Sequence, residues 1–313
     1  MATVFLNGEL RSLDDPAARV ALTDAGFMHA VGLFETMTAR READGVRVVR
    51  VDAHVRRLVE SARELQLSTS LRADPLAEAV EHTARAHLEH ADHDAARVRL
   101  TVTGGDLDLV RRVGERVGAA APTPTIAILA QRATEYPEEL FERGGLAVLA
   151  DAKVSPFDPT AGHKTLNYWW RLRELQAALG RGASEALVFS VTNHLCGGCV
   201  SNAFAVRDGA LVTPIARGEE EVAAASRPAL PSPVLPGVTR ATLLELAAEE
   251  GLAIERRLVS IDDVLDADEV FCTNASFGVL PITRVESREI GSGGVGPVTR
   301  QLGELLRGAD GAG

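Results

Sequence analysis

The spacing of apolar residues in the first third of the chain predicts a pair of amphipathic helices. Between Asp52 and Gln66 the apolar positions recur three or four residues apart, which places them on one face of a helix. The stretch from Leu76 to Leu88 repeats this spacing. Two helices with apolar faces are therefore expected in this part of the chain.

Short apolar runs predict strands on both sides of this helix pair. The run Val4–Asn7 is followed by a Gly8-Glu9 turn and a second run, which is typical of an opening hairpin. Alternation or continuous apolar character predicts four more strands, at Leu33–Thr38, Val46–Val51, Arg97–Thr103 and Thr125–Ala130. The first half is therefore expected to be a sheet with a helix pair.

A polar stretch, Gln131–Glu139, suggests a linker between two domains. The chain has 313 residues, which is more than one hydrophobic core usually serves. The second half contains predicted strands at Leu146–Leu149, Ala186–Ser190, Ala203–Val206 and Glu269–Thr273, and predicted helices at Leu166–Leu179 and Thr239–Glu250. We predict an α+β fold, with a small N-terminal α+β domain over residues 1–132 and a larger domain over 133–313.

Composition and charge restrict the class of protein. Hydrophobic residues make up 46% and charged residues 25%, which is ordinary for a globular chain. The net charge of −11 makes nucleic acid an unfavourable partner. The N-terminus does not resemble a signal peptide, and no apolar run is long enough to span a membrane. With three cysteines there is no disulfide framework, so we expect a cytoplasmic protein.

Lysine is scarce, which draws attention to Lys164. Of the 33 basic residues only Lys153 and Lys164 are lysines. Lys164 lies in the segment Gly162–Tyr168, at the expected start of a helix and beside aromatic residues. Partial desolvation there would lower the pKa of the amine and make it nucleophilic, and only a lysine can form a Schiff base. The alternative is an ordinary surface lysine at a helix start.

Two later segments could bind an anion. In Pro236–Arg240 a glycine and a hydroxyl residue open a predicted helix, whose free N–H groups favour a phosphate. The strand in Phe271–Ser276 ends in small and hydroxyl residues that can donate to the same group. Taken singly, these segments are better explained as an ordinary helix cap and an ordinary strand end.

Taken together and in order, these segments resemble the class IV aminotransferases, the fold type IV pyridoxal-phosphate enzymes. The family includes branched-chain aminotransferases, D-amino acid aminotransferases and aminodeoxychorismate lyases. The resemblance runs from about Phe5 to Leu306. It rests on Asp24–Phe27, Gly32–Thr36, the helix with His54 and Arg57, the Arg99 strand, the Lys164 segment, Ser201–Phe204, Leu235–Arg240 and Asp268–Phe271.

The resemblance implies a two-domain fold like that of D-amino acid aminotransferase, a homodimer, and pyridoxal 5'-phosphate as cofactor. Lys164 would hold the cofactor as a Schiff base and move the proton between the substrate Cα and the cofactor C4′. The implied phosphate ligands are Arg57, Val238, Thr239, Ala275 and Ser276. The implied substrate-binding residues are His29, Thr36 and Arg99, and no metal site is implied.

The sequence departs from the family at Gly197. The family has a glutamate there, five residues before Asn202, which pairs with the nitrogen of the cofactor ring. Without it, the ring nitrogen is expected to be less protonated and the ring a weaker electron sink. Cys196, His194 and water are the candidate substitutes. His29 also differs, since it replaces a tyrosine that faces the substrate, and it fits either that role or simple packing.

The leading hypothesis is an aminotransferase that moves an amino group between a branched-chain or D-amino acid and a 2-oxo acid. The second is an aminodeoxychorismate lyase that makes 4-aminobenzoate and pyruvate, because Thr36 stands where such lyases carry a threonine. The third is a relative that has lost cofactor-dependent catalysis and acts as a binding or cysteine-based redox protein. The spacing of Cys196 and Cys199 permits the redox role or a metal site, although a structural turn is the simpler interpretation.

Overall fold

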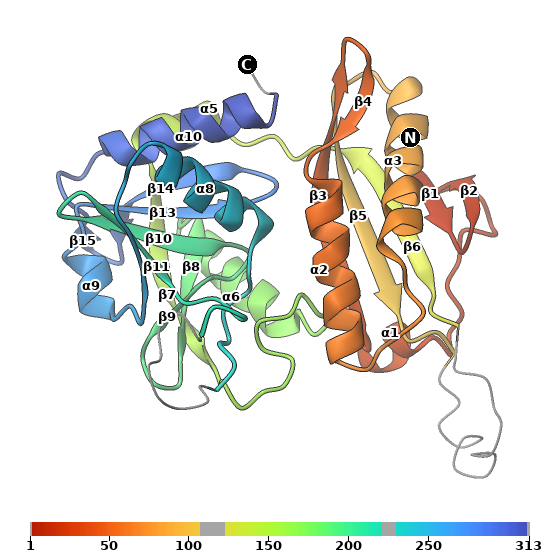
Figure 1. Cartoon of the computed structure of the whole chain (residues 1–313), viewed down its shortest axis with the longest axis horizontal. Coiled ribbons are helices and arrows are strands. Elements are labelled where there is room, and N and C mark those ends of the chain that lie inside the picture. Colours follow the sequence, from red (N-terminus) through yellow and green to blue (C-terminus); the bar gives the residue numbers. More distant parts are fainter. Residues whose placement is uncertain (1, 107–122, 221–229, 312–313) are drawn as a thin grey trace. The chain divides into compact units, whose positions relative to one another are not determined.

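The computed structural model describes residues 2–106, 123–220 and 230–311 (Figure 1). The chain divides into two compact units. Unit 1 contains Met1–Thr134 together with Lys164–Asn167, and unit 2 contains Glu135–His163 and Tyr168–Gly313. The sequence analysis assigned Lys164 to the second domain. That assignment needs correction, because the backbone of the lysine segment pairs with a strand of unit 1.

Unit 1 is built on an antiparallel sheet. Within the described residues its strands have the order β2-β1-β6-β5-β3-β4. They are β1 (Thr3–Leu6), β2 (Glu9–Ser12), β3 (Gly32–Glu42), β4 (Gly45–Val48), β5 (Ala95–Thr103) and β6 (Ile126–Arg132). Helices α2 (Val51–Glu64) and α3 (Ala73–Glu89) pack on one face of this sheet, and α1 (Ala25–His29) precedes β3 (Figure 1).

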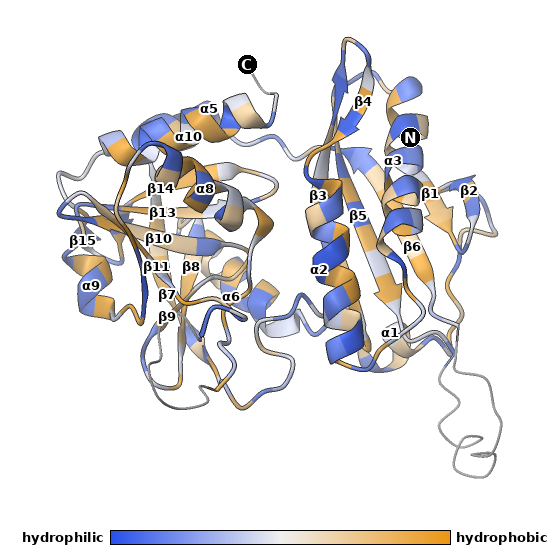
Figure 2. Ribbon diagram, viewed as in Figure 1, coloured by the Kyte–Doolittle hydropathy of each residue, from blue (hydrophilic) through white to orange (hydrophobic). Residues whose placement is uncertain are grey.

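Buried and less buried residues alternate along β5, so one face of the sheet in unit 1 belongs to the core and the other does not. Val98, Leu100 and Val102 are fully buried and belong to the same cluster as Val55 and Leu58 of α2. Successive strand residues point to opposite faces, so the residues between them lie on the face that α2 and α3 do not cover. Figure 2 shows the mixed hydrophobic and hydrophilic positions of α2 that the sequence pattern predicted.

Unit 2 is built on a mixed sheet. Its strands among the described residues have the order β12-β11-β10-β13-β14-β7-β8-β9, with β15 paired to β14. They are β7 (Gly145–Val154), β8 (Glu185–Ser190), β9 (Leu195–Gly198), β10 (Asn202–Arg207), β11 (Ala210–Pro214), β12 (Ile254–Arg257), β13 (Glu269–Asn274), β14 (Gly278–Val285) and β15 (Arg288–Glu289). The β7–β8, β7–β14 and β11–β12 pairs are parallel.

Five described helices accompany this sheet. They are α5 (Glu138–Arg143), α6 (Trp169–Gly180), α8 (Val238–Glu249), α9 (Ile261–Leu265) and α10 (Pro297–Ala309). Helix α6 packs against β7 and β8, whereas α8 and α10 pack against β13. Among the residues that the structure describes, no helix combines the length and the apolar character needed to cross a membrane.

Two differences between the predicted and observed bounds change how segments connect. The helix expected from Leu166 begins at Trp169, because the preceding residues are extended against β3. The strand expected over Val46–Val51 ends at Val48, and Val51 is the first residue of α2. Arg50 makes this change of direction with a φ of 52°, in the left-handed region.

Candidate active site

Lys164 lies in a short extended segment that pairs with the start of β3 in unit 1. The amide of Phe34 donates to the carbonyl of Lys164 (3.0 Å), and the amide of Leu166 donates to the carbonyl of Gly32 (2.9 Å). A side chain at Gly32 would meet Leu166 Cδ1 at 2.7 Å, so the close approach needs a glycine. The predicted helix-start position of Lys164 is therefore wrong, since two backbone hydrogen bonds keep the segment extended.

The side chains of Lys164 and Arg99 meet on the ring of Phe34. Lys164 Nζ is 4.3 Å and Arg99 Cζ 3.8 Å from the ring centroid, and both distances permit cation–π attraction. Thr36 shares the face of β3 with Phe34 and is the register partner of Arg99. Three predicted site residues thus gather on the sheet face opposite α2 and α3. His29 is exposed at the end of α1, not packed in a core.

Glu35 points to the other face of β3 and binds two side chains of α2. Arg57 donates to both carboxylate oxygens, at 2.8 and 2.6 Å, and His54 Nδ1 lies 2.8 Å from Oε2. Burial would raise the pKa of Glu35, but Arg57 and His54 hold it at about 2. Burial lowers the pKa of His54, although Glu35 opposes this. Arg57, the implied phosphate ligand, is thus held in place by a charged partner that the sequence analysis had treated only as a family marker.

Asp24 fixes the segment that leads into β3. Its buried carboxylate accepts hydrogen bonds from the hydroxyls of Thr103 and Thr125 and from the amide of Gly26, each at 2.7 Å. A side chain at Gly26 would meet Thr103 Cγ2 at 2.4 Å. The Asp24–Phe27 motif therefore anchors α1 to the ends of β5 and β6.

In unit 2, the N-terminus of α8 is held by Asn202 at the start of β10. Gly237 precedes the helix and has no side chain to cap its amides. Asn202 Nδ2 donates to the carbonyl of Leu235 (2.9 Å), and a side chain at Gly237 would lie 1.9 Å from Asn202 Oδ1. The glycine lets the loop before Val238 and Thr239 approach the strand, so the helix start has a fixed position within unit 2.

The end of β13 lies beside this helix start. Asn202 pairs in register with Thr273, and Asn274 Oδ1 accepts from the amides of Ser276 (2.8 Å) and Phe277 (2.9 Å). The hydroxyl of Thr273 is buried and has no hydrogen-bond partner. An unpaired buried hydroxyl is costly, and an acceptor such as phosphate would satisfy it. Uncapped amides and this hydroxyl fit the phosphate group of pyridoxal phosphate.

Gly197 lies in β9 with a φ of 125°, a conformation that residues with side chains rarely adopt. A Cβ there would be 2.7 Å from the carbonyl oxygen of Ser201. A glutamate at this position would therefore be strained. Two side chains contact the turn that follows Gly197, namely the N-cap residue of α6 and a residue in its first turn. The sequence analysis did not single out either of them. Tyr168 Oη donates to the carbonyl of Cys199 (3.3 Å), and Arg171 donates to those of Gly198 and Cys199 (both 3.2 Å).

The cysteines of this turn are buried thiols. Burial raises the pKa of Cys196 and of Cys199 to about 12. Both thiols are therefore protonated near neutral pH, which is unfavourable for redox or metal chemistry. In the part of the chain that the structure describes, no group of three or more histidine, cysteine or acidic side chains is arranged to hold a metal ion.

Comparison with known proteins identifies the family. The sequence pattern of the family described as "Amino-transferase class IV" matches residues 32–285. The chain belongs to the class IV aminotransferase family. Membership confirms the predicted family and the predicted enzyme class, and the folds compared below confirm the predicted fold.

Similar class IV aminotransferases include proteins of more than one specificity. A putative branched-chain-amino-acid aminotransferase of Methanocaldococcus jannaschii is 29% identical over 308 residues, covering 97% of this chain and 95% of the relative. A D-alanine aminotransferase of Staphylococcus haemolyticus is 27% identical over 312 residues, covering 97% and 96%.

Two solved structures illustrate the fold. The T.th. branched-chain amino acid aminotransferase, solved with pyridoxamine 5'-phosphate, has a TM-score of 0.83 at 22% identity and covers 99% of this chain and 95% of that one. The 4-amino-4-deoxychorismate lyase of Pseudomonas aeruginosa has a TM-score of 0.77 at 27% identity and covers 97% and 98%.

Proposed function

We propose that the protein is a pyridoxal-phosphate-dependent aminotransferase that moves an amino group between an amino acid and a 2-oxo acid. When bound, pyridoxal phosphate supplies the electron sink for reactions at the substrate Cα. Lys164 is the residue that binds it covalently and moves the proton at Cα. Amino acids of the branched-chain or D type are the proposed donors.

One observation carries this proposal, namely the position of the Lys164 amine. Backbone pairing with β3 fixes the lysine segment, and the amine lies on the Phe34 ring beside Arg99 and Thr36. Every amino acid and 2-oxo acid carries a carboxylate, and the guanidinium of Arg99 is suited to bind one. Thr36 adds a hydroxyl on the same face. We assign substrate binding to Arg99 and Thr36, and to His29 as an exposed residue of α1.

The donors in unit 2 support the choice of cofactor. Val238 and Thr239 begin a helix with uncapped amides, and Ala275 and Ser276 belong to the turn after β13. We propose that these four residues bind the cofactor phosphate, with Thr273 as a further donor. Arg57 is also a proposed phosphate ligand, and Glu35 holds its guanidinium in a buried site within unit 1.

Borohydride reduction of the protein loaded with cofactor, followed by peptide mapping, tests the role of Lys164. We expect the adduct on Lys164 and none on Lys153, whose amine is 3.4 Å from Asn193 Oδ1 in unit 2. The variants Lys164→Arg and Lys153→Arg form a matched pair, because the chain has no other lysine. An adduct on Lys153, or an active Lys164→Arg variant, contradicts the assignment.

Aminodeoxychorismate lyase activity is a second candidate. It is favoured by Thr36, which is half-buried on the same face of β3 as the Phe34 ring beneath the Lys164 amine. Release of pyruvate from aminodeoxychorismate separates the lyase from an aminotransferase, which instead needs a 2-oxo acid to complete turnover. If neither activity is found and no adduct forms on Lys164, the chain is a relative without cofactor-dependent catalysis.

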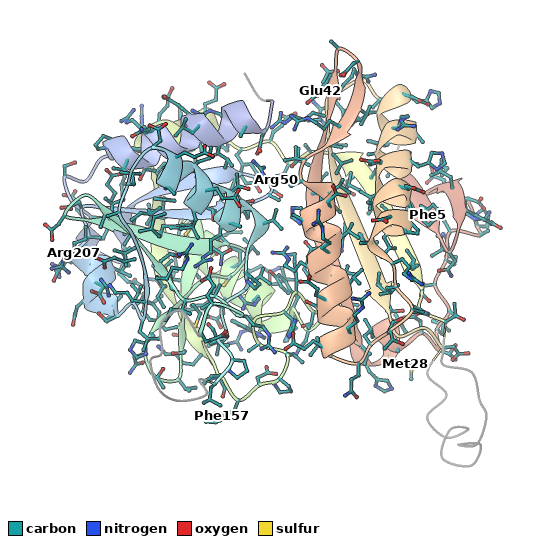
Figure 3. All side chains as sticks on the ribbon, in the orientation of Figure 1. Phe5, Met28, Glu42, Arg50, Phe157 and Arg207 are labelled. Atoms are coloured by element: carbon teal, nitrogen blue, oxygen red, sulfur yellow. The ribbon has the colours of Figure 1, made fainter. Side chains whose placement is uncertain are left out.

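We also propose that the protein is a homodimer. Each unit exposes large apolar side chains that association would cover. In unit 1 they include Phe27 (70% exposed) and Met28 (57%), and in unit 2 Phe157 (75%) and Trp169 (76%). Met28 and Phe157 project outward in Figure 3. Light scattering should give about twice the mass of one chain, and a stable, active monomer would contradict the proposal.

A further inference from the structure

The turn from Gly197 to Ser201 contains no acidic residue and is contacted by an arginine. Arg171 of α6 donates to the carbonyls of Gly198 and Cys199, and its guanidinium is 4.5 Å from the ring of Trp170. Arginine stays charged at any pH at which proteins fold. A positively charged guanidinium therefore donates to the carbonyl of Gly198, the residue after Gly197.

The backbone at Gly197 leaves no room for a carboxylate. Its φ of 125° and the 2.7 Å separation between a built Cβ and the Ser201 carbonyl oxygen make a side chain costly. The absence of an acid is thus built into the conformation of the turn and does not depend on the choice of one side chain.

Glu185 of β8 is an acidic residue that contacts the turn, but its carboxyl group is fully engaged. One carboxylate oxygen accepts from the amides of Ala186 and Cys199, and the other accepts from the amide of Val200 and the hydroxyl of Ser201. The carboxylate is completely buried, and burial raises its pKa. Glu185 stabilises the backbone of the turn and has no acceptor position left for another donor.

Glu174 adds negative charge near Cys199, but its carboxylate is bound by donors outside the turn, and the other polar groups are neutral or engaged elsewhere. Burial raises the pKa of Cys196 to about 12, so this thiol is neutral, and the charges that act on it come from Arg171 and Lys153. His194 Nδ1 lies 3.1 Å from the hydroxyl of Thr192. Glu174 of α6 accepts from the amide of Asp151 (2.9 Å) and from Arg173 (2.8 Å).

The turn adjoins the proposed phosphate site within unit 2. Asn274 Nδ2 donates to the carbonyl of Val200 (3.3 Å), and the same side chain orders the amide of Ser276. In pyridoxal phosphate the ring nitrogen is two ring atoms from the carbon that bears the phosphate arm. A cofactor held by its phosphate at Ser276 and α8 would therefore be bound next to this turn.

We propose that Arg171 is a positioning residue that holds the cofactor ring nitrogen unprotonated. The inference rests on the proposed function. The guanidinium of Arg171 donates to carbonyl groups of the turn, and its positive charge disfavours a second positive charge on a ring nitrogen bound beside it. The ring then withdraws less electron density from the substrate Cα. The side chains around the substrate must therefore contribute more to stabilising the negative charge that develops at Cα.

Nitrogen NMR of the protein loaded with 15N-labelled pyridoxal phosphate tests this without measuring activity. In the native protein we expect the ring nitrogen to give the signal of the unprotonated form through neutral pH. Arg171→Gln should raise the pKa of the ring nitrogen by about one unit. Arg173→Gln is the matched control, because Arg173 is on the same helix and its side chain is 63% exposed. It should leave the signal unchanged, as should Arg171→Lys, which keeps the charge.

The outcomes separate this inference from the proposed function. A protonated ring nitrogen in the native protein at neutral pH overturns the inference, even if no Arg171 variant folds. Equal shifts in Arg171→Gln and Arg173→Gln also overturn it. Failure of the labelled cofactor to attach to Lys164, read from the mass of the same sample, overturns the proposed function and the inference with it.

Discussion

Glu35 in unit 1 and Glu185 in unit 2 are both buried, but their carboxylates have partners of different charge. Glu35 is bound by the guanidinium of Arg57 and by His54. Glu185 is bound by backbone amides and the hydroxyl of Ser201. The pKa of Glu35 is held at about 2, whereas burial raises the pKa of Glu185.

The difference shows that the number of hydrogen bonds does not decide how a buried acid titrates. Each carboxylate is well hydrogen-bonded, but only at Glu35 do the partners, which are cationic, outweigh the loss of water around the charge. Glu35 lies on β3, the strand that also positions Lys164, and forms a charged pair with Arg57 of α2. Glu185 stabilises the backbone of a turn by accepting its amides. Arg171 contacts the same turn, but it donates to carbonyl groups and not to Glu185.

The largest effect is expected from Glu35→Gln. The variant leaves the guanidinium of Arg57 largely buried without its anion, which should lower the free energy of unfolding by about 3–5 kcal/mol. Glu42→Gln is a matched control on β3, because Glu42 pairs with Arg47 but its side chain is 30% exposed. Its cost should stay below about 1 kcal/mol. Equal losses for the two variants in urea denaturation would refute the role given to the buried pair.

The pH dependence of that loss should be the next largest effect. The pKa of Glu35 falls from 4.5 to about 2 on folding, so its contribution is present above pH 4.5 and disappears as the pH falls through 2. The shift corresponds to about 3 kcal/mol. The stability gap between native protein and Glu35→Gln should narrow as the pH falls from about 4.5 towards about 2. A gap that stays constant over this range would show that the charge of Glu35 is not involved.

Glu185→Gln should have a smaller effect, with the opposite pH dependence. Its amide group would face backbone donors, and the lost hydrogen bonds should cost about 1–2 kcal/mol. Because burial raises the pKa of Glu185, its favourable contribution is present below the unfolded pKa and is lost as the pH rises through the folded one. The gap between native protein and Glu185→Gln should therefore be larger at acid pH. If the stability difference between native protein and Glu185→Gln instead becomes smaller at acid pH, the two glutamates do not differ in pH dependence as proposed.

Local patterns in the sequence were sufficient for much of the fold. The spacing of Val55, Leu58 and Ala62 predicted α2, and alternation in β5 predicted which of its residues are buried. The order of motifs also indicated the family. These features depend on neighbours within a few residues, which is the range over which periodicity carries information.

Other features depend on residues distant in the chain and were missed. Lys164 was expected at a helix start, but its backbone pairs with Phe34, 130 residues earlier. Glu185 was not singled out from the sequence, because only the fold brings the amides of Cys199 and Val200 to it. Arg171 was one arginine among many until its contact with the Gly198 carbonyl was known. Such roles follow from tertiary contacts that a single sequence does not encode locally.

The grouping of Lys164–Asn167 with unit 1 has a consequence for how the protein can be divided. The chain leaves unit 1 after Thr134, returns for these four residues, and leaves again. No single cut separates the units, since residues 1–134 alone would lack the segment that pairs with the start of β3. Neither unit is a module that gene fusion or truncation could transfer intact. A fragment or fusion that keeps the proposed cofactor-binding lysine in its native position must therefore also keep β3, the strand that pairs with its segment.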